Sequence, residues 1–217
     1  MKNSNFYIKR NIYINRYILI GIILLLQACA SPIYYAKRIQ GQVVDEQTGE
    51  PLEGVIVVAE WVLLHKIPGK YYHDKKLRIV ETTTDQNGNY VISGSPMIRL
   101  RPLTELTDRD PEMSFFKKGY SPLFVSNSYD RDTVIRYSEW DGRILKLKRF
   151  NGTNERYAQS LRTLFRIDKS DWCFVPKLSQ AMYEEVNRLN SEDSYNSIIL
   201  PKVPDTMPDT NEFACFL

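Results

Sequence analysis

The sequence predicts a mainly β chain: a seven-stranded antiparallel Greek-key sandwich with a small α-helical C-terminal extension. Apolar residues fall on alternate positions, the period of half-buried strands. Two turn signals, Thr48-Gly49-Glu50-Pro51 and Asp85-Gln86-Asn87-Gly88, separate the strands, because Gly and Asn tolerate positive φ and Pro presets φ near −65°. Beyond residue 150 the apolar period changes from that of strands to that of helices. The alternating residues are Ile39, Val43, Val55, Val57, Ala59 and Trp61.

The first 28 residues predict an export signal. Lys2, Lys9, Arg10 and Arg16 form a basic leader that contains no acidic residue, and residues 17–26 form an uninterrupted apolar run. Ten helical residues rise about 15 Å, half of what a bilayer core requires, so the run is expected to be a signal-peptide core.

Leu26-Gln27-Ala28-Cys29 ends that run and resembles the lipobox of bacterial lipoproteins, although Gln27 is an unusual occupant of its position. The resemblance implies lipidation of Cys29, palmitate included; the alternative is an ordinary signal peptide with a chance cysteine. Ala30 stands where an Asp would resemble an inner-membrane retention signal, which favours outer-membrane delivery and leaves the membrane face open. Residues 29–36 are then expected to be a short lipidated tether.

Removal of the leader changes the charge balance. The chain carries 29 Lys and Arg against 26 Asp and Glu, so loss of the four leader bases leaves 25 against 26, a net charge of −1. A protein of that charge has no overall attraction for nucleic acid. The expected partners are the membrane through Cys29, an envelope protein, and as an alternative a glycan.

The β unit is expected to span residues 37–150. A long hairpin runs out over residues 55–67, turns at Pro68-Gly69 and returns over residues 70–84; later strands are expected at 97–101, 113–118, 121–126, 133–137 and 143–148. Residues 103–112 are expected to be a loop insertion. Asp85-x-Asn87-Gly88 superficially resembles a calcium loop, but the required Gly and Glu positions do not match, so a turn is favoured.

The pattern Gly41-x-Val43-x-Asp45-x-x-Thr48-Gly49-x-Pro51-Leu52-x-Gly54, closed by Thr84-Asp85-x-Asn87-Gly88-x-Tyr90, resembles the carboxypeptidase regulatory-like domain. Phe115-Phe116-Lys117-Lys118-Gly119-Tyr120 extends the likeness to about half of the chain. The resemblance implies a transthyretin/Ig-like sandwich that serves as an accessory module in bacterial envelope proteins. These motifs concern turns and strands and imply no molecular activity.

The hairpin at 62–78 carries a basic, aromatic tip: His65, Lys66, Tyr71, Tyr72, His73 and Lys75. Such a surface invites a ligand, either phosphate-bearing lipid headgroups or an acidic glycan. The simpler interpretation is a solvated hairpin whose lysines protect strand edges from pairing with other chains. His65 and His73 alone make a weak metal site, so no metal is expected.

Residues 151–217 are expected to form a helical extension with a tail. Tyr157, Leu161, Leu164 and Phe165 share one face of a helix that Asn154 would cap. A second helix begins near Pro176 with Leu178, Met182, Val186 and Leu189 on one face. Both are too short to be stable alone and are expected to pack on each other or on the sandwich.

The sequence contains none of the motifs that define common catalytic sites. A Ser–His–acid site would have to use His65 or His73, on a hairpin expected to be mobile, and the pairs Asp108/Asp110 and Glu184/Glu185 are expected to be solvated. No catalytic residue and no cofactor is therefore expected. Two function classes follow: a lipid-anchored interaction module, or a binder of a glycan or lipid headgroup, with a hydrolase as a weaker third reading.

The three cysteines allow one bridge. Lipidation of Cys29 leaves Cys173 and Cys215, and an oxidising envelope compartment favours a disulfide between them. The alternative is a pair of buried thiols that pack as small apolar side chains.

Overall fold

The computed structural model describes residues 33–67, 70–100, 104–107, 109–128, 134–166 and 169–192, with no side-chain detail for 66–74, 165–170 and 192. The expected signal peptide, Cys29 and the tail after residue 192 lie outside the described residues.

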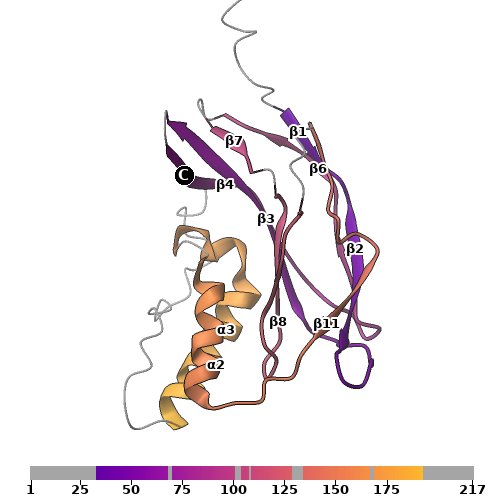
Figure 1. Cartoon of the computed structure of the whole chain (residues 1–217), viewed down its shortest axis with the longest axis vertical. Helices are drawn as coiled ribbons and strands as arrows, with labels where there is room; N and C mark the ends of the chain where they lie inside the picture. The colour runs from indigo at the N-terminus through magenta and orange to yellow at the C-terminus, as the bar shows by residue number, and fades with distance from the viewer. Residues whose placement is uncertain are drawn as a thin grey trace, which may run out of the picture.

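The described residues form a mainly β structure with two α-helices, which confirms the predicted class (Figure 1). The strands are β1 (Ile33–Ala36), β2 (Ile39–Asp45), β3 (Ile56–Ile67), β4 (Lys70–Thr83), β5 (Asn89–Ile92), β6 (Ser95–Ile98), β7 (Thr104–Leu106), β8 (Glu112–Phe116), β9 (Leu123–Val125), β10 (Ile135–Arg136) and β11 (Arg143–Leu147). The helices are α2 (Asn154–Leu161) and α3 (Pro176–Glu192), with 3₁₀ turns η1 (Arg162–Arg166) and η2 (Lys169–Phe174) between them.

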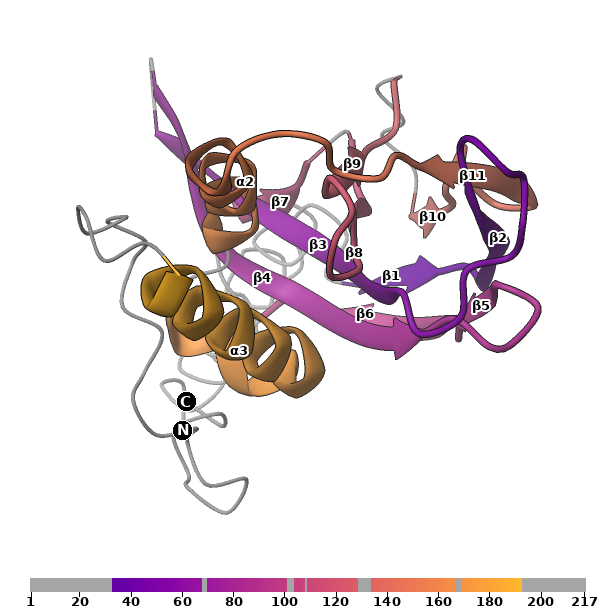
Figure 2. The same cartoon turned by 90° about the horizontal axis from the view of Figure 1, so that it is seen from below.

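The described strands form three sheets around one core. The largest has the order β4-β3-β8-β9, with β7 added to β3, and the two smaller sheets have the orders β11-β2-β5 and β10-β1-β6. Figure 2 shows the large sheet facing the two small ones. Side chains from all three sheets meet between them, including Val43, Trp61, Tyr90, Met97 and Phe115.

Two ladders are parallel, which corrects the expectation of an all-antiparallel sheet. β11 pairs with β2 and β10 pairs with β1 in parallel. In both cases the partners lie far apart in the sequence, and a long connection permits either direction, whereas a hairpin permits only one.

The expected hairpin forms as predicted. β3 and β4 pair antiparallel from Ile56 opposite Thr83 to Ile67 opposite Lys70, with register shifts between Trp61 and Leu64. β3 also reads as apolar on both faces. Val57, Ala59 and Trp61 point into the core between the sheets, as does Val55 just before the strand, whereas Ile56 and Val58 point the other way and pack under the helices.

Two expected boundaries move. The tether expected at residues 29–36 ends in a strand, because Tyr34 and Ala36 are buried in the core and β1 pairs with both β6 and β10. The expected loop at 103–112 contains β7, which pairs with β3 and buries Leu106. These short strands contribute to the described total of eleven where seven were expected.

The two helices form one layer on the outer face of the large sheet, as Figures 1 and 2 show. Tyr157, Leu161 and Leu164, together with Leu178, Met182 and Leu189, are buried there against Ile56, Val58 and Phe116. Of the two packing partners expected for the helices, each other or the β unit, the structure shows the large sheet of the β unit. The cap of α2 is Thr153 and not Asn154: Thr153 has extended backbone angles, and its side chain accepts from the Arg156 N–H, while Asn154 is already helical. No described helix has both the length and the hydropathy to cross a bilayer.

The turn between β2 and β3 is organised by one carboxylate. Asp45 Oδ1 accepts from the N–H groups of Gln47 and Thr48, while Oδ2 accepts from the Tyr120 hydroxyl at 2.8 Å and from Arg149 Nε at 2.7 Å. The hydrogen bond from Arg149 holds the pKa of Asp45 well below its usual range. Asp45 thus ties the turn to the segments that follow β8 and β11.

Asp45→Asn should flatten the acid dependence of stability. The folded-state pKa of Asp45 is lowered, so the stability that it contributes is present above its unfolded pKa of about 3.9 and is lost as the pH falls further. We expect the melting temperature of the unsubstituted protein to fall more steeply below about pH 4 than that of the variant. Glu46→Gln, an exposed neighbour, is the control. Equal slopes for Asp45→Asn and the unsubstituted protein would contradict the prediction.

Candidate functional site

The expected ligand surface is described only in part. His65 is half-buried in β3, opposite Tyr72 of β4 and Thr104 of β7, and Lys75 is exposed. The backbone register places His73 opposite Leu64, so the two histidines are not cross-strand partners. The side chains of Lys66, Tyr71, Tyr72 and His73 lie outside the described detail.

One lysine next to the expected tip belongs to the interior instead. Lys76 is largely buried; its Nζ lies 2.7 Å from Glu60 Oε1 and 3.4 Å from Asp171 Oδ2. Burial raises the pKa of Glu60. The positive charge of Lys76 acts against this increase, and the nearby Glu112 carboxylate adds to it. Lys76 therefore neutralises a carboxylate pair that links the sheet to η2, and it is not a free basic group of the hairpin.

A cavity of about 150 Å³ adjoins this ion cluster. Glu60 and Glu112 are direct cross-strand partners on β3 and β8, and both line the cavity. Its other lining residues are Met113, Ser114, Phe124, Val125, Ser126, Thr163 and Leu164. No histidine or cysteine is among these lining residues. Their hydroxyl groups therefore have no imidazole among them to act as a base, and the lining contains no thiol nucleophile. With Lys76 compensating Glu60, the cavity is best understood as part of the joint between sheet and helices.

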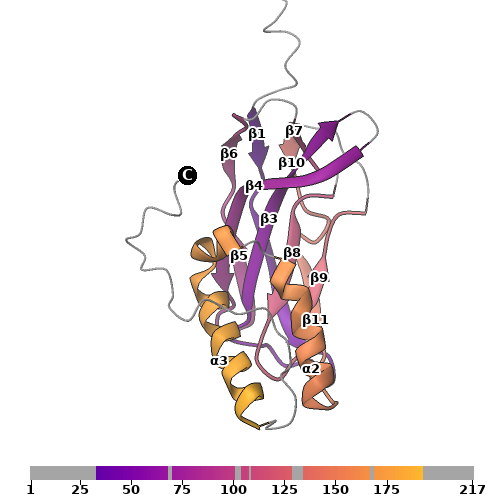
Figure 3. The same cartoon turned by 90° about the vertical axis from the view of Figure 1, so that its left-hand side faces the viewer.

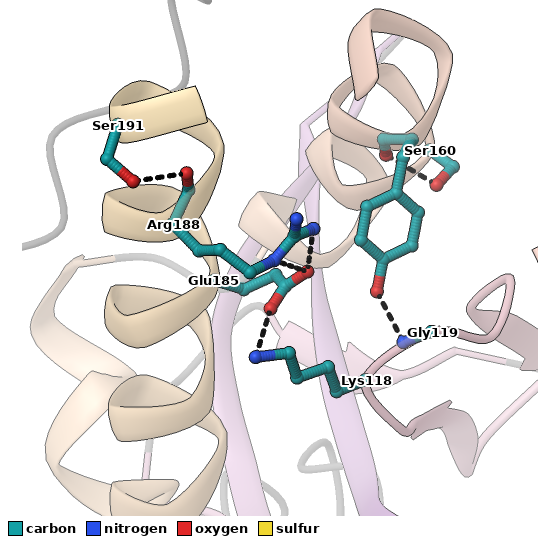
Figure 4. Close-up of polar contacts among 7 residues, drawn as sticks. Lys118, Gly119, Ser160, Glu185, Arg188 and Ser191 are labelled. Carbon is teal, nitrogen blue, oxygen red and sulfur yellow. Dashed lines mark hydrogen bonds and ion pairs between the residues drawn. The ribbon is translucent and has the colours of Figure 1, made fainter. Parts of the chain in front are cut away.

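A second polar cluster joins α3 to the turn after β8 (Figure 4). The Glu185 side chain is 1% exposed; Oε1 lies 2.5 Å from Arg188 Nη2, and Oε2 lies 3.5 Å from Lys118 Nζ. Beside it the Tyr157 hydroxyl accepts from the Gly119 N–H at 3.1 Å. Burial raises the pKa of Tyr157. The cluster fixes the helical layer to the sheet.

These contacts correct the expectation that the carboxylate pairs are solvated. Glu185 and Asp110 are buried, while Glu184 is exposed and Asp108 lies outside the described residues. Asp110 is matched by Arg136, whose Nη1 lies 3.3 Å from Asp110 Oδ1. Asp110 is compensated by a cation from a distant strand, and Glu185 is compensated by Arg188 one turn along the same helix and by Lys118 from the turn after β8.

The N-terminus of α3 is capped by a strand. The Glu81 carboxylate on β4 accepts from the N–H groups of Lys177 at 3.0 Å and Leu178 at 2.8 Å. These N–H groups have no partner within the helix, and the helix dipole favours a negative charge at this end. Glu81 thus positions α3 on the sheet.

Glu81→Ala should destabilise the protein by about 1–2 kcal/mol, because it removes a charged cap and leaves two N–H groups of α3 without that acceptor. Urea unfolding measures the change. Glu53→Ala, an exposed glutamate on the β2–β3 connection, is the control and should stay within about 0.5 kcal/mol of the unsubstituted protein. Equal stabilities for Glu81→Ala and Glu53→Ala would show that the cap is dispensable.

The surface feature that sequence reasoning missed is an apolar face on the sheet β10-β1-β6. The ladder places Ile33 beside Ile98, and Tyr35 beside both Pro96 and Ile135. Residues directly opposite each other share one face of a sheet, and all five are exposed. We call these five residues the apolar face. Residues 33–36 (IYYA) contain no polar residue that would mark which side chains face solvent, so the sequence of this segment holds no local signal for the face.

The remaining site predictions concern cysteines. Cys173, in η2 between buried Trp172 and exposed Phe174, is disulfide-bonded. Cys29 and Cys215 both lie outside the described residues, so the pairing of Cys173 with Cys215 and the lipidation of Cys29 stay predictions.

Comparisons with known proteins add no function. No family model and no curated protein matches the sequence. The chain is similar to 3-chlorocatechol 1,2-dioxygenase from Rhodococcus opacus, with 15% identity and a TM-score of 0.29 over 56% of this chain and 62% of the dioxygenase. A streptococcal ancillary pilin is matched with 14% identity and a TM-score of 0.23 over 54% of this chain and 30% of the pilin. The chain thus spans less than two thirds of either protein. Similarities at these TM-scores establish neither a shared fold nor a shared function.

Proposed function

We propose that the chain is a lipid-anchored accessory protein of the bacterial cell envelope that acts by contact and not by catalysis. The proposal includes a signal peptide at residues 1–28, lipidation of Cys29, outer-membrane delivery, and an envelope protein as partner. The observation that carries it is the apolar face, which lies on a sheet whose strand β1 starts four positions after Cys29. An exposed apolar surface is typical of a module that acts by contact, either with a protein or with a membrane, whereas a ligand binder would show a concave, aromatic-lined site.

The same proposal assigns the β unit to the carboxypeptidase regulatory-like type, a Greek-key sandwich of transthyretin/Ig-like form. Its support is the paired turn signature. Asp85 Oδ1 accepts from the N–H groups of Asn87 and Asn89, and the Val43 N–H donates to the Gly88 carbonyl oxygen at 2.8 Å. Gly88 has a φ of 72°, and a Cβ there would collide with the Val43 carbonyl, so only glycine fits.

Non-catalytic action is supported by the polar clusters. The described buried carboxylates at Asp45, Asp110 and Glu185 each face an arginine, and Glu60 faces Lys76. Paired in this way, they are suited to hold elements together and not to exchange protons with a substrate.

Cys29→Ser tests the anchor. The variant should incorporate no labelled palmitate and should move from the membrane fraction to the soluble or precursor fraction, because serine cannot take the thioether-linked lipid. Glu46→Gln, a substitution of an exposed residue far along the chain from Cys29, is the control and should leave acyl label and fractionation unchanged. Continued palmitate incorporation and membrane fractionation of Cys29→Ser would show that the lipoprotein proposal is wrong.

A second candidate is a glycan- or headgroup-binding hairpin. Its support is the pairing of β3 with β4, which resumes after the register shifts and runs out to Ile67 opposite Lys70, so that the basic segment is held as an arm of paired strands (Figure 2). The exposed Lys75 lies on that arm. Retention on a sulfated-glycan column that is lost in Lys75→Glu would favour this candidate over the contact module.

A further inference from the structure

The apolar face has an unusual composition for a solvent-exposed surface. Ile33 is 52% exposed, Tyr35 47%, Ile98 60% and Ile135 48%. Arg136, the one charged residue in these three strands, is buried. Contiguous apolar surface without charged side chains marks a contact with another apolar phase or molecule.

Exposure is highest at the end of the sheet where β1 begins. Ile33 and Ile98 form the first ladder pair, and Leu100, two residues past β6, is 88% exposed. Val134 is 49% exposed and lies beside Tyr35, because its carbonyl accepts from the Tyr35 N–H at 2.8 Å. Figure 3 shows this end of the molecule away from the helical layer, with β1, β6 and β10 together. The apolar surface therefore widens toward the point where the chain enters the fold.

The chain itself limits how far this end can lie from the anchor. Ile33 lies four positions after Cys29, and four fully extended steps of the chain span at most about 14 Å. A short tether of this kind raises the local concentration of the face at the anchoring surface to the millimolar range or above.

We propose that the apolar face rests on the lipid surface that holds the anchor, with the side chains of Ile33, Tyr35 and Ile98 in the headgroup and upper acyl region. This inference rests on the proposed lipidation of Cys29. Tyr is enriched at membrane interfaces, and surface-lying elements insert apolar side chains by about 5–10 Å. A bilayer meets the requirement better than a protein partner does, because the tether already places it within reach and the face has no exposed charge for specific recognition.

Photo-crosslinking of the full chain in native membranes tests the inference. Ile98 is replaced by the photoreactive residue p-benzoylphenylalanine, and the control carries the same probe at Ile144. Ile144 is the matched position because it is also a strand isoleucine, 62% exposed, but lies on β11 in a different sheet. Tyr35 provides a second probe position on the apolar face.

We expect the yield of phospholipid adduct, measured by mass spectrometry of digests, to be about three- to twelvefold higher at positions 98 and 35 than at 144, the range expected from burying roughly half of an isoleucine side chain. Equal yields at 98 and 144 would overturn the inference. So would a crosslink from position 98 to a single envelope protein, to a second copy, or to the chain's own C-terminal segment. The acyl label on Cys29 is measured in the same samples: its loss overturns the anchor as well, whereas its presence without a lipid adduct overturns the docking alone.

Discussion

Arg136→Met should lower the free energy of unfolding by about 3–5 kcal/mol, because it removes from buried Asp110 the positive charge of its ion-pair partner. The Arg136 and Asp110 side chains are 4% and 0% exposed, and Nη1 and Oδ1 lie 3.3 Å apart. The guanidinium also lies 5.2 Å from the centre of the Tyr34 ring, a cation–π contact that the variant loses. Urea unfolding of the full chain measures the change.

The double variant Arg136→Met/Asp110→Asn separates charge from packing. Removing both charges should recover at least half of the loss, since a buried pair replaced by neutral groups of similar volume is often nearly neutral. Arg143→Met, on an exposed arginine of β11, should stay within about 0.5 kcal/mol of the unsubstituted protein. A double variant as unstable as the single one would show that packing and not the buried charge dominates.

This ion pair also connects the fold to the proposed function. Arg136 is the inward residue of β10, and its neighbour Ile135 belongs to the apolar face. Asp110 lies two residues before β8 of the large sheet. Its backbone carbonyl accepts from Asn127 Nδ2 at 2.9 Å, and Asn127 lies two residues after β9 of the same sheet. The pair thus holds the small sheet that carries the apolar face against the rest of the core. Because Arg136 points away from the apolar face, we expect Arg136→Met to lower the yield of lipid adduct at position 98 only in proportion to the fraction of the protein that it unfolds.

The sequence predicted the elements whose signals are local. The Pro68-Gly69 turn signal and the alternating apolar residues on either side predicted both arms of the β3–β4 hairpin. The apolar period of residues 176–192 predicted α3 with its buried Leu178 and Met182. In these places, turn chemistry and periodicity depend on neighbours a few residues away, so a single sequence contains all the necessary information.

Buried charges could not be predicted in the same way. Lys76 lies in a run of basic residues that reads as a solvated tip, yet it is held by Glu60 on the paired strand and by Asp171, far along the chain. Glu185 follows exposed Glu184 directly, and only its place on the helix face, under Lys118 and Arg188, distinguishes the two. The desolvation cost of a charge is set by its partners in three dimensions, which local composition does not record.

The apolar face was missed for a different reason. β1 and β6 have four residues each and β10 has two, too few for periodicity to separate a strand from a tether or loop. Tyr34 and Tyr35 are neighbours of the same residue type, yet one is buried and the other exposed because successive side chains point to opposite faces. Only pairing with distant strands establishes which of them faces solvent.

The bridge at Cys173 should be worth about 4 kcal/mol if its partner is Cys215, because a loop of that length restricts the unfolded chain by that amount in the entropy model. Cys173 is disulfide-bonded, and the chain contains three cysteines; the proposed acylation of Cys29 would leave Cys215 as the partner. We expect no free thiol in the denatured, unreduced mature protein. Cys215→Ser and Cys173→Ser should each lose about 4 kcal/mol of unfolding free energy, and the double variant should lose no more, because all three break the same bond. Two free thiols per chain would rule the bridge out, and a Cys29–Cys173 peptide in a non-reduced digest would contradict both the bridge and the anchor.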